Sequence, residues 1–209
     1  MAYRCVAASV AGFVQQLAVA YVANGYWFYV SGRVPDPKDP ASVDRKILTR
    51  YGIEVSKWTR ARRKKTGQAR VQYLRYGRRF VILATHGEHP FFTEEEKQVR
   101  DIRRHPIHFM GYALGCRKGR DGKTWHPSVR IERELCRELK ARFAAMAVQR
   151  SVEDLCRELG RIDYEGYAPV RDQLRGILRV VNRRRKAAGF ELVPRSALWL
   201  RRIPVKPFG

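Results

Sequence analysis

The sequence of 209 residues has only four cysteines, Cys5, Cys116, Cys136 and Cys156, which lie far apart and form no CxxC pair. This excludes a paired-cysteine zinc pattern and gives no sign of a disulfide scaffold, so a reducing compartment, the cytoplasm, is predicted. The chain also lacks a P-loop, a dinucleotide-binding glycine fingerprint and a Ser-His-Asp signature. A nucleotide-cofactor enzyme is therefore not expected.

Acidic residues are scarce: 20 Asp and Glu stand against 43 Lys and Arg, which gives a formal net charge of +23. Compact folding has to overcome this self-repulsion, so the balance predicts a polyanionic partner. Of the basic residues, 32 are Arg and 11 are Lys. Arginine favours nucleic acid because its planar fork matches phosphate and stacks on bases. The competing interpretation is that the arginines are merely solvated and reflect Arg-rich codon usage.

Charge is missing altogether from the 28 residues between Cys5 and Gly32. Gln15 and Gln16 interrupt this run near its middle, and Asn24-Gly25 ends it as a helix C-cap would. We therefore expect a buried helix over about residues 9–23 and a buried strand after it. A membrane partner is not predicted.

The remaining patterns predict an α+β fold with an antiparallel or mixed sheet built from hairpins, and with helices concentrated in the C-terminal third. We expect a sheet-containing domain over residues 1–131, with a basic helix and hairpin, and a helical portion over 132–209 packed on it as one compact unit. A capping box of Thr93 and Glu96 predicts a short helix to about Arg104. The other expected elements are helices over about 40–51, 56–66, 132–148, 151–159 and 169–188, strands over 26–34, 69–76, 79–84, 107–117 and 125–131, and a possible strand in the tail after Arg195.

No acidic residue occurs over residues 55–87, where adjacent cations of a predicted helix repel one another. Phosphates would relieve this repulsion and release condensed counterions. Alternation in the next strand places Tyr73 and Arg75 on one face and Gln72 and Tyr76 on the other, which suits stacking with unpaired bases. The alternative is that the tyrosines pack in the core and the arginines are only solvated. The candidate nucleic-acid-binding residues here are Lys57, Trp58, Arg60, Arg62, Arg63, Lys64, Lys65, Arg70, Tyr73, Arg75 and Tyr76.

The last predicted helix carries basic residues at every fourth position, beside an apolar face wide enough for docking on the protein itself. These are Arg171, Arg175, Arg179 and Arg183. Such a row could follow a nucleic-acid backbone, although no helix-turn-helix, zinc finger or other DNA-reading motif is present. Base-specific readout is not predicted.

All five histidines lie between residues 86 and 126, and the segment after a buried strand contains His86, Glu88 and His89. These three are candidate metal ligands and catalytic residues, because imidazoles and a carboxylate could bind Mg²⁺, Mn²⁺ or Zn²⁺ beside a basic cleft. The segment departs from the His-hydrophobic-His pattern of the HUH single-strand nucleases, since two residues separate its histidines. A histidine beside a proline is also often a simple turn residue.

We therefore expect a nucleic-acid-binding protein that grips RNA or single-stranded DNA through the Arg-rich helix and hairpin and through the basic C-terminal helix. One alternative is a metal-dependent nuclease or strand-transfer enzyme of a mobile element or defence system. A second alternative is a structural subunit of a ribonucleoprotein or effector complex.

Overall fold

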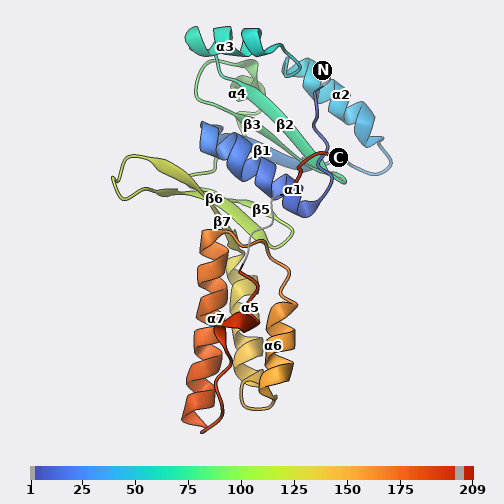
Figure 1. Ribbon diagram of the computed structural model, residues 1–209. Helices are drawn as coiled ribbons and strands as arrows, with labels where there is room; N and C mark the ends of the chain where they lie inside the picture. The colour runs from blue at the N-terminus through green and yellow to red at the C-terminus, as the bar shows by residue number, and fades with distance from the viewer. Residues whose placement is uncertain (1–2, 201–204) are drawn as a thin grey trace. The chain divides into compact units, whose positions relative to one another are not determined.

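The computed structural model describes residues 3–200 and 205–209, which form two compact units (Figure 1). The sheet unit comprises the chain up to Ile107 together with residues 114–128 and 205–209. The helical unit comprises residues 108–113 and, of the described chain, residues 129–200. Helices combine with two antiparallel sheets, so the predicted α+β class is confirmed, as are the helices near the C-terminus.

The sheet unit is built on four antiparallel strands in the spatial order β2-β3-β1-β4. Their bounds are β1 Phe28–Arg33, β2 Val71–Tyr76, β3 Arg79–Ala84 and β4 Arg100–Asp101. β2 and β3 form the predicted hairpin, in which Tyr76 pairs with Arg79, and β3 then pairs with β1 from Ala84 opposite Phe28 onward. Helices connect β1 to β2 and β3 to β4, which gives the split β-α-β connectivity.

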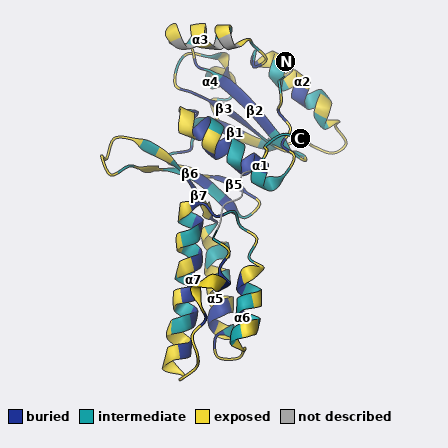
Figure 2. Cartoon of the chain, viewed as in Figure 1, coloured by how far each residue is buried: buried dark blue, intermediate teal, exposed yellow. Residues whose placement is uncertain are grey.

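Helices cover both faces of this sheet. On one face, Val30, Tyr73 and Ile82 pack with Tyr51 and with residues of α2 (Pro40–Arg50) and α4 (Pro90–Glu94). The other face is covered by the N-terminal helical segment, in which α1 (Val10–Gln15) contacts β2 and continues as a π-helix over Gln16–Tyr21. The strands are therefore largely buried, as Figure 2 shows, and the sheet offers no open face to a ligand.

The chain's last described residues return to α1. The Pro207 carbonyl accepts a hydrogen bond from the Ala8 N–H at 2.9 Å, and the Val205 carbonyl accepts one from the Gln15 side chain at 2.6 Å. A Cβ added at Gly12 would lie 3.0 Å from the Pro207 Cα, so glycine allows this close approach. The expected helix over 9–23 is confirmed, and it is anchored by a segment nearly 200 residues away in sequence.

The capping box of Thr93 and Glu96 is a wrong prediction. The helix in this region, α4, starts earlier, at Pro90, and His89 is its N-cap: the His89 Nδ1 accepts a hydrogen bond from the Phe91 N–H at 3.1 Å. Proline at the first helical position fits this start because it has no N–H to satisfy. The chain then turns and pairs as the short strand β4, which sequence patterning missed.

A second sheet has the order β5-β6-β7, with β5 Ile107–Phe109, β6 Tyr112–Lys118 and β7 Trp125–Ile131. The expected long strand over 107–117 is interrupted by a tight turn at Met110-Gly111, where both residues have positive φ, 46° and 80°. Such a pair of φ values is the geometry of a two-residue hairpin turn.

The helical unit contains α5 (Arg133–Met146), α6 (Val152–Gly160) and α7 (Ala168–Ala187). α5 packs on α7, and the core includes Phe143, Leu155 and Ile177. After α7 the chain folds back to a short 3-10 helix, η3 (Arg195–Ala197), in place of the strand expected there. None of the helices in the described ranges is both long enough and apolar enough to pass through a membrane.

Candidate nucleic-acid interface

The basic helix α3 (Lys57–Lys65) presents a tryptophan to solvent. Trp58 is 85% exposed, which is unusual for so large an apolar side chain. Arg62 and Lys65 follow it by four and seven residues, so the three share one face of the helix. We call Trp58, Arg62 and Lys65 the α3 face; both cations are exposed and form no ion pair within the described part of the chain. The side chains of Lys57, Arg60 and Lys64 lie outside the described residues.

The stacking role predicted for Tyr73 is wrong. Its ring is fully buried, and its hydroxyl donates to the Asp44 Oδ1 at 2.6 Å. Arg75 lies beside it, with its side chain only 11% exposed, and forks onto the same carboxylate with contacts of 2.7 and 2.8 Å. Burial, and then hydrogen bonding to Asp44, raises the pKa of the Tyr73 phenol. Tyr73 and Arg75 therefore belong to the core network with Asp44, and the binding role predicted for Arg75 is also wrong.

The other candidates of this region differ in their freedom to bind a ligand. The Arg63 guanidinium donates to the Gly52 carbonyl at 3.0 Å, and the Arg70 guanidinium lies 5.1 Å from the centre of the Tyr26 ring. Both are half-buried, as is Tyr76. Of the three predicted stacking residues, the structure leaves only Trp58 extensively exposed.

The proposed metal ligands do not come together. His86 packs near the Phe28 ring at a centroid distance of 6.4 Å, the Glu88 side chain is exposed, and the Nδ1 of His89 is already used as the cap of α4. Burial, and then the positive charge of Arg63, lowers the pKa of His89. Throughout residues 3–200 and 205–209, no three His, Cys, Asp or Glu side chains are grouped to hold a metal ion. His86, Glu88 and His89 therefore do not form the predicted Mg²⁺ or Mn²⁺ site, and their catalytic role stays a prediction that the structure does not test.

Sequence patterning missed an alternation of cations and indole rings in the sheet unit. The Arg103 guanidinium lies 4.4 Å from the centre of the Trp27 ring and 5.9 Å from that of Trp125, and the Lys118 amine lies 5.6 Å from Trp125. Asp101 holds Arg103 in place through contacts of 2.9 and 2.7 Å. We call Trp27, Arg103, Trp125 and Lys118 the cation–π ladder. These residues are widely separated in sequence, so the ladder can be recognised only from the fold.

The ladder continues into the loop that joins β6 to β7. Four cations lie at the end of β6 and in this loop, and we call them the hairpin tip: Arg117, Lys118, Arg120 and Lys123, all of them exposed. The one carboxylate nearby, Asp121, accepts hydrogen bonds from the Thr124 hydroxyl and from the backbone N–H groups of Lys123 and Thr124, which lower its pKa. Asp121 therefore closes the turn, and the described residues provide no ion pair for the tip cations.

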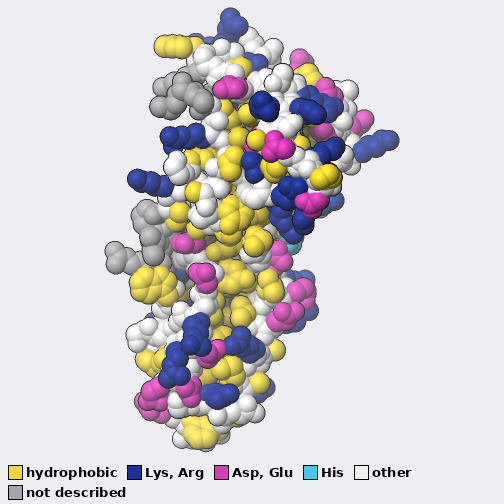
Figure 3. Space-filling model, turned by 90° about the vertical axis from the view of Figure 1, so that its right-hand side faces the viewer, with side chains coloured by type: hydrophobic (Ala, Val, Ile, Leu, Met, Phe, Trp, Pro, Cys, Tyr) yellow, Lys and Arg dark blue, Asp and Glu magenta, His cyan; other side chains and the backbone are white. Residues whose placement is uncertain are grey.

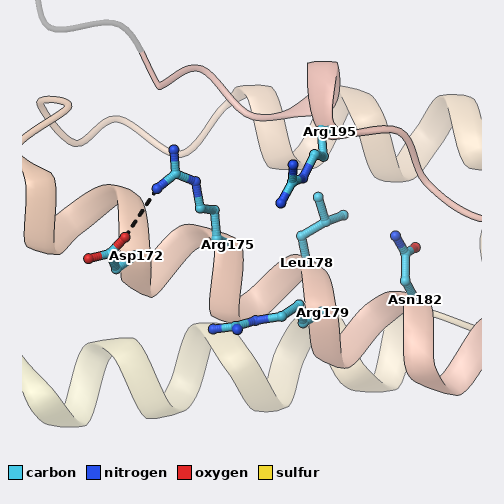
Figure 4. A pocket seen from close by; sticks show the side chains of 6 residues that line it. All are labelled: Asp172, Arg175, Leu178, Arg179, Asn182 and Arg195. Carbon is cyan, nitrogen blue, oxygen red and sulfur yellow. Dashed lines mark hydrogen bonds and ion pairs between the residues drawn. The ribbon is translucent and has the colours of Figure 1, made fainter.

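In the helical unit, the predicted row of arginines on α7 divides. The Arg171 guanidinium donates to the Gly166 carbonyl at 2.8 Å, and Arg183, one turn beyond Arg179, is exposed. Arg175 points toward a hollow of about 340 Å³ between α7 and η3, and Arg179 is part of its lining (Figure 4). The hollow, which we call the α7 hollow, is lined by Asp172, Arg175, Leu178, Arg179, Asn182 and Arg195.

In comparisons with known proteins, no family model, no curated protein and no solved structure matches this chain.

Proposed function

We propose that the protein binds single-stranded nucleic acid, RNA or DNA, through surfaces of its sheet unit, and that it does so in the cytoplasm. The observation that carries this is the α3 face, where an 85% exposed indole stands beside two cations that form no ion pair with any described carboxylate. Aromatic rings stack on unpaired bases of any sequence, and adjacent Lys and Arg neutralise the phosphates between those bases. The free thiols of all four cysteines suit a reducing compartment.

The hairpin tip and the cation–π ladder offer a second surface with the same chemistry. The hairpin-tip cations form no ion pairs within the described chain, and Trp125 adds an aromatic surface between Arg103 and Lys118. Duplex is the less favoured ligand because paired bases present no free faces for stacking. Sequence-independent binding is expected, because stacking and phosphate neutralisation do not distinguish bases.

The test is a fluorescence anisotropy titration in which the full-length protein is added to a labelled nucleic acid of about 16 nucleotides. Single-stranded RNA, single-stranded DNA and a duplex of the same length are compared. Affinity should fall steeply as NaCl rises from about 50 to about 200 mM, because bound phosphates release counterions. Trp58→Ala should weaken single-strand binding about tenfold, a loss within the range of one stacked base. Trp58→Phe should retain most of the affinity because it keeps an aromatic face.

Equal affinities of the wild type and Trp58→Ala for every strand would refute the stacking role of the α3 face. If the wild type had no salt-dependent affinity for any isolated strand, the proposal as a whole would fail. That second outcome would favour the structural subunit of a ribonucleoprotein, whose charge is neutralised only in its assembly.

A further inference from the structure

The α7 hollow combines uncompensated positive charge with an apolar floor. Arg175 projects from α7 and Arg195 from η3 into the same space beside Leu178, and Arg179 follows on the next turn of α7 (Figure 4). Asp172 is the only carboxylate among the described lining residues, and it pairs with Arg175 at 3.1 Å. Arg179 and Arg195 have no ion pair within the described residues, so the lining carries a net charge of +2.

A neighbouring hollow in the same unit shows how an ordinary solvated surface differs. It is lined by side chains of α5, α6 and the residues between them, and its cations have partners: Arg142 contacts Glu158 at 2.6 Å, and Arg157 contacts Asp154 at 2.9 Å. Two of its three arginines are therefore neutralised by the protein itself. The α7 hollow neutralises only one of three.

The backbone that carries Arg195 is fixed against α7. The Asn182 amide donates to the Val193 carbonyl and accepts from the Val193 N–H, both at 2.9 Å. Val193 is buried on one side of Arg195, and Ala197 and Leu198 are buried on the other. The backbone at Arg195 is thus fixed before any ligand binds, which reduces the ordering cost of binding.

We propose that the α7 hollow binds a phosphomonoester group, carried either by a small nucleotide or by the 5′ end of a nucleic-acid strand. Guanidinium groups match phosphate oxygens through paired N–H donors. A phosphomonoester above its second pKa of about 6 carries a charge close to −2, which balances the +2 of the lining, whereas a backbone phosphodiester carries only −1. The volume of about 340 Å³ exceeds a phosphate alone and leaves room for a sugar against Leu178. This proposal does not depend on the α3 face.

The first experiment titrates the full-length protein with inorganic phosphate at constant ionic strength and follows the arginine side-chain NMR signals. Phosphate should shift the signals of Arg175, Arg179 and Arg195, and binding should weaken about tenfold in Arg195→Gln. Arg183→Gln is the matched control, because Arg183 is exposed on the same helix but outside the lining. Arg179→Gln is a second variant for the case in which Arg195→Gln loses the fold, as judged by circular dichroism.

Failure of phosphate to shift these signals would overturn the proposal, as would equal binding by Arg195→Gln and Arg183→Gln. Binding should also weaken below about pH 6, where phosphate becomes a monoanion.

The second experiment identifies the source of the phosphate. A nucleoside monophosphate and a 5′-phosphorylated oligonucleotide are compared with the same oligonucleotide ending in a 5′-hydroxyl. If Arg195→Gln weakens binding of the nucleotide alone, the hollow is a small-molecule site. If it weakens binding of the 5′-phosphorylated strand, the hollow binds strand ends. If it weakens binding of neither ligand, the proposal is refuted. Trp58→Ala should leave phosphate binding unchanged, so a failure of single-strand binding and a failure of this site are distinguishable.

Discussion

Among the described residues, each unit holds an arginine whose side chain is largely withdrawn from solvent, and the two are stabilised differently. In the sheet unit, Arg75 is paired inside the fold with the buried carboxylate of Asp44. In the helical unit, Arg185 is 4% exposed and donates only to backbone carbonyls, those of Ala147, Arg150 and Glu191. The sheet unit therefore uses an acidic residue internally, and the helical unit keeps its acidic residues for the surface.

The other carboxylates extend this contrast. In the sheet unit, Asp39 caps α2, Asp101 holds Arg103, and Asp121 closes a turn. In the helical unit, four arginines form ion pairs with carboxylates three residues away: Arg137–Glu134, Arg157–Asp154, Arg161–Glu158 and Arg175–Asp172. The units contain 25 and 18 basic residues against 10 acidic residues each. The sheet unit therefore has the larger excess of cations, 15 against 8.

The helical unit shows that basic composition alone does not define a binding surface. Figure 3 shows acidic side chains interspersed with Lys and Arg on its visible face, as expected for solvated helices. A continuous cationic surface over this face is therefore not supported. The α7 hollow, whose described lining has two arginines without an ion pair, differs from this balanced face. The proposed binding surfaces are distinguished by cations without ion pairs rather than by the number of arginines.

The largest effect is expected from removing the internal carboxylate of the sheet unit. Asp44→Ala leaves the Arg75 charge unpaired in the core, along with the Tyr73 hydroxyl, so the free energy of unfolding should fall by about 3 to 5 kcal/mol. Urea denaturation measures this. The double replacement Asp44→Leu with Arg75→Met should cost less than Asp44→Ala, and an equal or larger loss would contradict the description of a coupled buried pair.

The matching change in the helical unit should cost less. Arg185→Met leaves three carbonyls without their donor but strands no opposite charge, so we expect a loss of about 2 to 3 kcal/mol in the same measurement. Arg184→Met serves as the control because Arg184 is exposed and donates only to the Ala144 carbonyl. A loss larger than that of Asp44→Ala would reverse the comparison between the two buried arginines.

Surface charges should separate the units in salt dependence. Arg120→Gln with Lys123→Gln should reduce the slope of log affinity against log salt by about 1.4 for a single strand, because two phosphate contacts are lost. Arg137→Gln with Arg161→Gln removes the same charge from the helical unit and should leave the slope nearly unchanged, because these cations are already paired. Equal reductions in the two double variants would show that long-range charge, and not contact at the hairpin tip, controls binding.

The smallest effect concerns the cap of α4. Burial and Arg63 lower the pKa of His89 in the folded protein, so the unfolded state binds the proton more tightly. The stability due to neutral His89 is fully present above its ordinary pKa of about 6.5 and is lost as the pH falls through the lower folded value. His89→Asn keeps a capping side chain and removes the titration, so its melting temperature should fall less than that of the wild type between about pH 7.5 and pH 5. His86→Asn is the control, and pH dependences that are identical in all three proteins would exclude this role.

Much of the fold followed from local patterning. The uncharged segment predicted the N-terminal helix, and alternation with a glycine turn predicted the β2–β3 hairpin. Which face of that hairpin is buried could not be predicted from the sequence. Tyr73 of the hairpin and Trp58 of α3 are equally plausible stacking residues until the fold buries Tyr73 beside Asp44. The cation–π ladder and the α7 hollow join residues that are distant in sequence, and a single chain carries no local signal for such contacts.

The most direct test of the central claim is ultraviolet crosslinking of the full-length protein to a 5′-hydroxyl single strand at about 150 mM salt, followed by mass spectrometric mapping. Crosslinks are expected on peptides that contain Trp58 or the hairpin tip, and they should diminish in Trp58→Ala. Crosslinks confined to the helical unit would contradict the assignment of binding to the sheet unit.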